Sequence, residues 1–372
     1  MNKLKTCFLF LGLLFLSNLI QAQQSNWYTY NQTYYKILTA KDGIYRITPE
    51  VLAANGVNVN AIDPRTIRLY HRGKEVAVSL VGQEDGSFDS EDYLDFYGLR
   101  NDGTLDSLLY TKFDRLPNPY FNTHSDSTAF FLTITPGEFG LRMSERPAPE
   151  NNLAQLTSFG TEKVMAYGEQ YSLGVGYAFD FRLSIYDQGQ GWMSSIITKG
   201  NTRSFTLTDL GNPSNSGPAR LEIGLVGRSL HNHSTRISVG PTAASQRLVQ
   251  TENFYGYEYP QLTLPLTMGD FNGDGSIVIS VQSSGTEAAD NVSVAYTKVV
   301  FQERVVQGDF PSKLFLLPPG NQQISISQLN SNYEAFEISD YRRPQKVMLS
   351  NSESTQVPSF SIIRQQQNLA SK

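Results

Sequence analysis

The sequence predicts an all-β protein with little helix, made of a β-rich N-terminal domain followed by a jelly-roll-like β-sandwich. The composition favours strands and turns, with 20 Tyr, 21 Phe, 29 Gly and 17 Pro in 372 residues. Charged residues make up 17% of the chain, well below the usual value of about 25%, which excludes a coiled coil. Short apolar alternations recur between turn residues, as is typical of sandwiches and barrels.

The strand pattern predicts two hairpins and one helix. Lys41-Asp42-Gly43 is expected to join the first two strands, and residues 71–74 the next two. Thr48 is a helix cap followed by Pro49, and Gly56 ends that helix. The predicted strands are residues 35–38, 44–47, 66–70, 76–81, 130–135, 178–186, 204–208, 221–226, 277–281 and 292–301.

The first 22 residues have the layout of a secretory signal peptide. Lys3 and Lys5 precede an apolar run at 8–16, and a cut after Ala22 is expected. The run is shorter than the ~20 residues of a spanning helix, although an uncleaved N-terminal anchor is the alternative. We therefore expect an exported protein in the periplasm, on the outer membrane surface or outside the cell. Its mature form lacks the one cysteine, Cys7, and has no disulfide.

The mature chain is expected to divide into four parts. A Pro- and Asn-rich stretch within residues 137–156 cannot form a central strand, so we place a domain boundary there. The predicted parts are an N-terminal β domain at 23–145, the sandwich at 153–305, a further β segment at 306–349 and a polar tail or linker at 350–372.

The sequence offers few groups for catalysis. No Gly-x-Ser-x-Gly motif is present, and no cysteine nucleophile remains after export. With 30 basic and 35 acidic residues, the chain lacks the positive charge of a nucleic-acid-binding protein. His231 and His233 stand two residues apart, as two metal ligands on one strand face do, but a solvated pair at a strand end is the alternative.

Two weak binding sites are predicted. Asp270, Asn272 and Asp274 match the first half of a calcium loop, although Val281 stands where the closing Glu belongs and a tight turn explains the run equally well. Tyr255, Tyr257 and Tyr259 are expected to line one face of a strand, either as a stacking platform for a ligand such as a sugar or as a packed aromatic row.

Four segments of the first region carry a family resemblance. They are residues 41–47 (KDGIYRI), 63–76 (DPRTIRLYHRGKEV), 84–98 (EDGSFDSEDYLDFYG) and 101–110 (NDGTLDSLLY). In this order they resemble the N-terminal, non-catalytic region of PorU-like proteins, the gingipain-related cysteine peptidases that act as sortases of the type IX secretion system in Bacteroidetes-type bacteria. Residues 187–192, 294–301, 333–340 and 366–369 resemble later parts of the same region more loosely.

The resemblance implies a module that scaffolds or docks a peptidase domain. The family's catalytic His and Cys belong to that domain, and no position here matches them, so we expect this chain not to be an enzyme. We expect it to be a fragment of a longer protease, with a stand-alone accessory chain as the alternative. The implied partners are the peptidase domain and an outer-membrane barrel such as PorV; a stand-alone carbohydrate- or surface-binding sandwich is the rival function.

Overall fold

The computed structural model describes residues 27–112, 116–147, 155–176, 181, 183–305, 312–318, 324, 326 and 333–348. The predicted signal peptide and polar tail lie outside these residues. Strands in several sheets dominate the described part, and its α-helical content is one helix of six residues, α2 (Pro49–Ala54). The predicted all-β fold class is therefore confirmed. None of the helices in this part of the protein is long and apolar enough to span a membrane.

The chain forms two compact units, each built from separate stretches of sequence. Of the described residues, the first unit takes those in 27–98, 129–143 and 338–344, and the second takes those in 99–128, 144–337 and 345–348. The passage at 143 to 144 falls inside the stretch predicted to hold the domain boundary. Residues 99–128, however, precede that stretch and still belong to the second unit.

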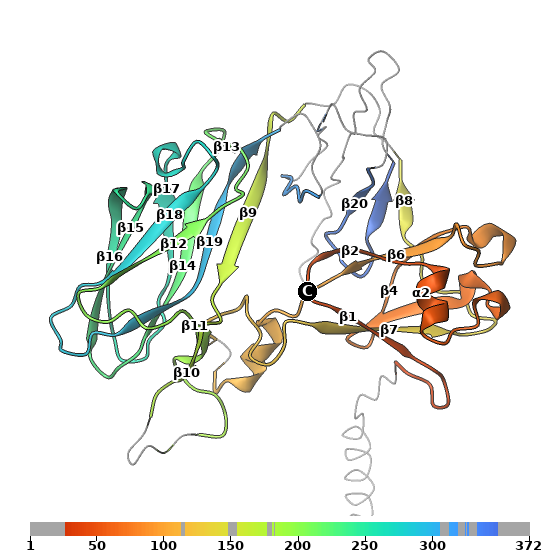
Figure 1. Cartoon of the computed structure of the whole chain (residues 1–372), viewed down its shortest axis with the longest axis horizontal. Helices are drawn as coiled ribbons and strands as arrows, with labels where there is room; N and C mark the ends of the chain where they lie inside the picture. The colour runs from red at the N-terminus through yellow and green to blue at the C-terminus, as the bar shows by residue number, and fades with distance from the viewer. Residues whose placement is uncertain are drawn as a thin grey trace, which may run out of the picture. The chain divides into compact units, whose positions relative to one another are not determined.

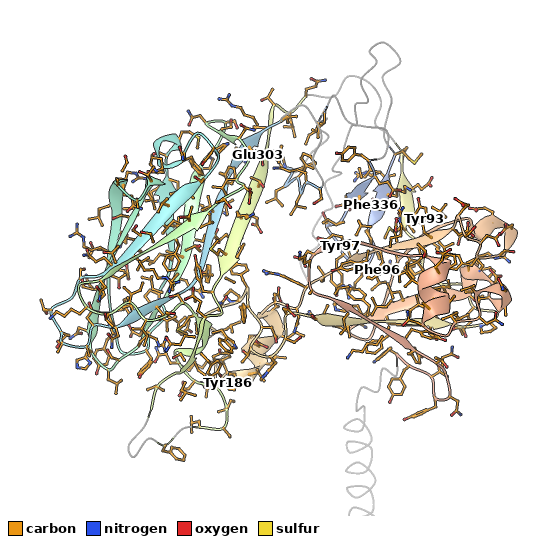
Figure 2. The ribbon with its side chains drawn as sticks, in the orientation of Figure 1. Tyr93, Phe96, Tyr97, Tyr186, Glu303 and Phe336 are labelled. Carbon is orange, nitrogen blue, oxygen red and sulfur yellow. The ribbon has the colours of Figure 1, made fainter. Side chains whose placement is uncertain are left out.

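The first unit contains two sheets and the helix. The four-stranded sheet has the order β1 (Tyr35–Thr39), β7 (Thr128–Ile134), β3 (Ile67–His71), β4 (Lys74–Val76). The three-stranded sheet has the order β2 (Gly43–Ile47), β6 (Tyr93–Gly98), β5 (Ser79–Val81). Side chains from both sheets and from α2 form one core, which includes Leu52, Leu69, Leu80, Phe96 and Phe130. Phe96 is fully buried in this core (Figure 2).

The predicted hairpin at Lys41-Asp42-Gly43 is wrong, because β1 and β2 belong to different sheets. The Tyr45 hydroxyl donates to the Lys41 carbonyl oxygen at 2.9 Å and accepts from the Lys41 N–H at 3.3 Å. The Tyr45 side chain thus hydrogen-bonds the backbone N–H and carbonyl of Lys41, and the chain passes from one sheet to the other across this turn.

The second hairpin and the helix are confirmed. Leu69 pairs with Val76 across β3 and β4, and the turn uses positive φ angles at Arg72 and Gly73. The returning strand is shorter than predicted, because Ser79–Val81 forms β5 in the other sheet. Helix α2 starts after an extended Thr48, has proline at its first position and is followed by Gly56 at φ 83°.

The second unit is built around a β-sandwich (Figure 1). One sheet has the order β12 (Thr202–Leu207), β18 (Ile277–Ser283), β15 (Asn232–Thr242), β16 (Ser245–Tyr255). The other has the order β13 (Pro213–Ser214), β19 (Val292–Arg304), β14 (Ala219–Gly227), β17 (Gln261–Leu266), and β9 (Ser158–Ala166) also pairs with β19. Buried residues from both sheets form a single core, among them Phe205, Ile223, Ile237, Ile279 and Val299.

Smaller elements complete the second unit. Two further sheets are β10 (Gln170–Leu173) with β11 (Gln190–Met193), and β20 (Ala335–Glu337), β21 (Gln345–Val347), β8 (Ser144–Arg146). The strand predicted at 178–186 is wrong where it is described, since residues 181 and 183–186 make only a bridge between Tyr186 and Tyr110; residues 178–180 and 182 lie outside the described part. The described short 3-10 helices of the two units are η2 (Val59–Ala61), η3 (Pro64–Thr66), η4 (Gln83–Asp85), η5 (Thr104–Leu109) and η8 (Met268–Asp270).

Candidate functional site

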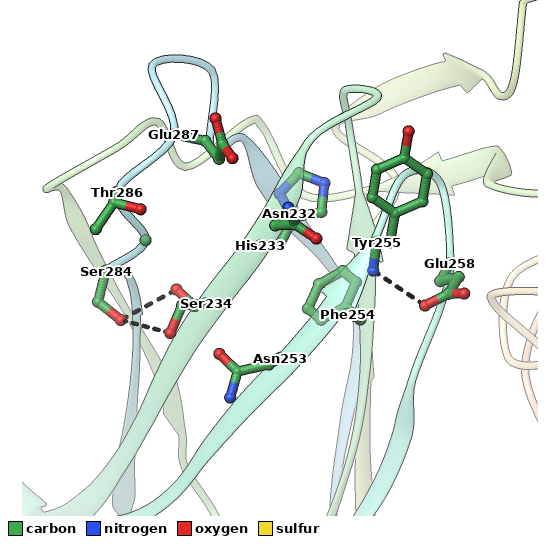
Figure 3. Close-up of a pocket in the computed structure, with 11 residues that line it drawn as sticks. Asn232, His233, Ser234, Asn253, Phe254, Tyr255, Glu258, Ser284, Thr286 and Glu287 are labelled. Atoms are coloured by element: carbon green, nitrogen blue, oxygen red, sulfur yellow. Dashed lines mark hydrogen bonds between the residues drawn. The ribbon is translucent and has the colours of Figure 1, made fainter.

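A polar pocket of about 510 Å³ opens at one end of the sandwich, where β15 begins and β16 ends (Figure 3). A loop that follows β18 forms its third side. The lining residues are Asn232, His233, Ser234, Asn253, Phe254, Tyr255, Glu258, Ser284, Gly285, Thr286 and Glu287. We call this the β15–β16 pocket.

Strand register explains which side chains the pocket receives. Asn232 pairs with Tyr255, and Ser234 pairs with Asn253. Residues directly opposite in an antiparallel pair share a face, and alternate residues share it too, so these four side chains stand together on the outer face of the sheet. His233 lies on the opposite face, beside Phe254.

A buried hydrogen bond between His233 and Asp290 lies behind the pocket. The His233 and Asp290 side chains are fully buried, and His233 Nδ1 lies 2.9 Å from Asp290 Oδ1. His233 Nε2 faces two carbonyl oxygens, of Gly256 at 3.0 Å and of Ser229 at 3.2 Å. The other Asp290 oxygen accepts from the Gly285 N–H at 2.6 Å. The pair therefore ties the start of β15, the turn after β16 and the pocket loop to one another.

The hydrogen bonds of His233 argue against the hypothesis that His231 and His233 together bind a metal. Both ring nitrogens of His233 are already hydrogen-bonded, so neither offers a lone pair to a cation. His231 precedes β15, and its Nδ1 is buried without a hydrogen-bond partner in the described structure. No group of three His, Cys, Asp or Glu residues suited to a metal occurs among the described residues.

Several polar groups in the pocket remain available. The Tyr255 side chain is 53% exposed and contacts no other ring in the described part of the chain. Within that part, the side chains of Asn232, Asn253, Thr286 and Glu287 make no hydrogen bond. On one side, the Ser284 hydroxyl donates to the Ser234 carbonyl at 3.0 Å, which holds the loop against β15.

The predicted row of three tyrosines does not lie on one strand. Strand β16 ends at Tyr255, and Gly256 turns the chain with φ 66°. Tyr255 faces the pocket, whereas Tyr259 packs against a small buried cluster around Met193 and Tyr296. Glycine after the first tyrosine was the sequence signal for this break, because its freedom at positive φ suits a turn.

The predicted calcium residues each accept hydrogen bonds from protein groups, Asp270 from a side chain of β16 and from its own turn, and Asn272 and Asp274 from their own turn. The Asp270 carboxylate is buried and accepts from Arg247 at 2.7 and 2.8 Å and from the Thr267 N–H at 2.7 Å. Burial alone raises the pKa of Asp270, but Arg247 and Thr267 outweigh it and hold that pKa below its ordinary value. Asn272 accepts from the Gly273 N–H, and Asp274 accepts from Ser276. Calcium binding stays a prediction, and these contacts favour the turn.

An exposed apolar segment marks a second surface of the same unit. Phe181, Leu183 and Ile185 lie in the connection between β10 and β11 and are 61%, 42% and 44% exposed. We call these three residues the apolar loop. Tyr186 anchors its end through two backbone hydrogen bonds to residues 109 and 111, and Leu108 beside it is 65% exposed.

Comparison with known proteins gives a likeness in fold that covers most of this chain. No family model matches the sequence, and no curated protein matches it. The crystal structure of dimeric latent PorU from Porphyromonas gingivalis matches with a TM-score of 0.61 and 15% identity, over 90% of this chain and 31% of that chain. The chain has a PorU-like fold. It spans about a third of the length of that PorU chain.

Other solved structures match over a smaller part. A CBM36-1 domain of a xylanase from the hindgut metagenome of Trinervitermes trinervoides matches 37% of this chain, with 13% identity and a TM-score of 0.23 over 96% of its own length. Tobacco streak virus coat protein matches 43% of this chain and 95% of its own, with 12% identity and a TM-score of 0.23. The PorU-like fold thus rests on the match that extends over nearly the whole chain.

Proposed function

We propose that this protein is an exported, non-catalytic β module that docks and positions a peptidase domain of the PorU-like sortase type. The observation that carries the proposal is the fold likeness to PorU, which covers 90% of this chain and 31% of PorU. The order of the four resembling segments in residues 41–110 supports the same assignment. In this account the chain contributes contact surfaces, and the catalytic His and Cys come from the docked domain.

The apolar loop is our candidate for the docking surface. The side chains of Phe181, Leu183 and Ile185 are exposed. Burying them against a partner would contribute about 25 cal/mol of free energy per Å² of apolar area removed from water. A stable interface needs about 800 Å² from each partner, and a few large apolar anchors at its centre carry most of the binding energy. Tyr186, fixed to residues 109–111, would hold the loop in place while it binds.

Association with a separately produced PorU-like peptidase domain tests this function. Isothermal titration of that domain into the mature chain is expected to show saturable one-to-one binding. The double variant Leu183→Ser/Ile185→Ser is expected to weaken binding at least about tenfold, the equivalent of about 1.4 kcal/mol. Leu248→Ser, which changes a 47% exposed leucine on β16, is the control and should bind as the unchanged chain does.

The opposite result would reject the proposal. If both proteins are folded and show no binding at 100 μM, the chain is not a docking module for that domain. Hydrolysis of a peptide substrate by the mature chain alone would also contradict a non-catalytic role. An outer-membrane barrel of the PorV type, which the resemblance implies as a partner, can be titrated in the same way.

A further inference from the structure

We propose that the β15–β16 pocket binds a neutral saccharide, with the Tyr255 ring stacked on a sugar face and the pocket's amides and hydroxyls bonded to the sugar's hydroxyl groups. The pocket's volume of about 510 Å³ lies within the range of about 300–1,000 Å³ that small-molecule sites occupy. This inference does not depend on the docking of a peptidase domain.

Tyr255 has the properties of a stacking platform. Its ring is 53% exposed at the edge of the pocket and contacts no other ring in the described structure. Its backbone is fixed, because its N–H donates to Glu258 Oε2 at 3.0 Å (Figure 3). The face of a pyranose ring carries C–H groups, so it can cover an aromatic face while the sugar hydroxyls around its edge stay hydrogen-bonded.

The remaining lining suits a ligand with many hydroxyl groups. Asn232 and Asn253 each offer two donors and an acceptor, and the Thr286 hydroxyl both donates and accepts. None of these side chains is hydrogen-bonded elsewhere in the described residues. Each hydroxyl group of a polyol offers one donor and two acceptor lone pairs, so a polyol can satisfy this mixed set.

The charges in the pocket indicate a neutral ligand. The eleven lining residues include no Lys or Arg, the nearby Lys199 ammonium donates to the Thr286 carbonyl oxygen, and both ring nitrogens of His233 are already bonded. Two carboxylates, Glu258 and Glu287, would repel a phosphate, sulfate or acidic sugar. They stand on different sides of the pocket and so do not converge on one cation (Figure 3).

The His233–Asp290 pair makes the pocket rigid before any ligand binds. The Asp290 carboxylate accepts a hydrogen bond from the Gly285 N–H, and the Ser284 hydroxyl donates one to the Ser234 carbonyl, so the loop and β15 keep their spacing. A site that needs no ordering on binding keeps more of its interaction energy as affinity. This rigidity favours a small ligand bound through a few weak contacts.

A glycan array followed by isothermal titration tests the proposal on the mature chain. The probes are neutral xylo-, manno-, cello- and galacto-oligosaccharides, with polygalacturonate as the acidic comparison. At least one neutral series is expected to bind. Tyr255→Ala should weaken that binding at least tenfold and Asn253→Ala severalfold, whereas Tyr255→Phe should retain it. Tyr30→Ala, which removes a 75% exposed tyrosine of the other unit, is the matched control.

Three results would overturn the proposal: no binding of any neutral probe at 10 mM by folded protein, binding that Tyr255→Ala leaves unchanged, or a preference for polygalacturonate. The pocket variants also separate this inference from the proposed function. Tyr255→Ala is expected to leave binding of the peptidase domain unchanged, and Leu183→Ser/Ile185→Ser is expected to leave saccharide binding unchanged.

Discussion

His71 illustrates how burial sets the charge of a single residue in the first unit. Its side chain is fully buried, stacks on Phe130 with ring centroids 4.2 Å apart, and has Nδ1 3.2 Å from the Tyr341 hydroxyl. Burial, with a smaller effect from Arg72, lowers the pKa of His71 to about 4. The folded protein therefore keeps this imidazole neutral at pH values where the unfolded chain protonates it.

This pKa predicts a loss of stability in mild acid. The unfolded histidine takes up a proton near pH 6.5, but the folded one does so near pH 4, so the free energy of unfolding should fall as the pH drops through that window. The loss is about 3 kcal/mol in total, since one pKa unit corresponds to about 1.4 kcal/mol. Urea unfolding at pH 7, 5.5 and 4.5 measures it.

The variant His71→Gln should remove that part of the pH dependence. His124→Gln, which changes an exposed loop histidine, should leave the profile as it is. Equal profiles for His71→Gln and the unchanged chain would show that another group causes the acid response.

A second prediction for a single residue concerns the contribution of Asp270 to stability. Asp270→Asn is expected to destabilise the protein by about 1–3 kcal/mol, because it weakens the charge-assisted bonds to Arg247 and Thr267 at a buried site. Asp274→Asn, in the exposed part of the turn, should change stability less. The lowered pKa of Asp270 implies that its contribution is present above its ordinary pKa of 3.8 and is lost as the pH falls below it.

Thermal unfolding of these variants, with and without calcium, decides between the turn and the metal site. We expect no rise in Tm on addition of 5 mM CaCl2. A rise that Asp274→Asn abolishes would instead establish the calcium loop predicted from sequence.

The His233–Asp290 pair joins strand β15 to the loop between β18 and β19, and it gives a prediction at the scale of these elements. Removing the Asp290 carboxylate leaves His233 Nδ1 buried without its hydrogen-bond partner, which costs about 1–3 kcal/mol. Asp290→Ala should therefore lower the free energy of unfolding by about that amount and raise amide exchange at Gly285. Glu287→Ala, three residues earlier in the same loop, is the control. An Asp290→Ala variant with unchanged stability would show that the pair does not hold the pocket.

Local sequence signals predicted individual elements better than their partners. Pro49 and Gly56 predicted helix α2 because the preferences of proline and glycine for helix ends act within a few residues, although the Thr48 side chain makes no cap hydrogen bond. The Asp42-Gly43 signal failed because β1 and β2 pair with strands of two different sheets. Sheet partners are chosen by packing between distant residues, which a single sequence does not reveal.

In the candidate site, too, local sequence signals predicted single residues but not the distant residues that they meet. The sequence predicts Tyr255 as a ligand residue and His233 as a possible metal ligand, but it predicts no role for the other residues that line the pocket. Asn232 and Ser284 carry no local signal, and they meet only because β15 pairs with β16 and with β18. The His233–Asp290 contact joins residues 57 positions apart, which alternation in the sequence cannot predict.

The whole molecule consists of two compact units and has a PorU-like fold. The sequence resemblance predicted a PorU-like region, and the structural match supports that fold over 90% of the chain. The function proposed for it places the apolar loop at a protein interface and leaves the β15–β16 pocket open to a small ligand. Both surfaces belong to the second unit.

Amide hydrogen exchange of the mature chain, alone and with a PorU-like peptidase domain, tests the docking claim most directly. Protection is predicted for the described residues 183–186 and for the adjoining residues 108–111, with exchange around Tyr255 unchanged. Exchange that is identical at every peptide under saturating peptidase domain would contradict the claim that this chain acts as a docking module.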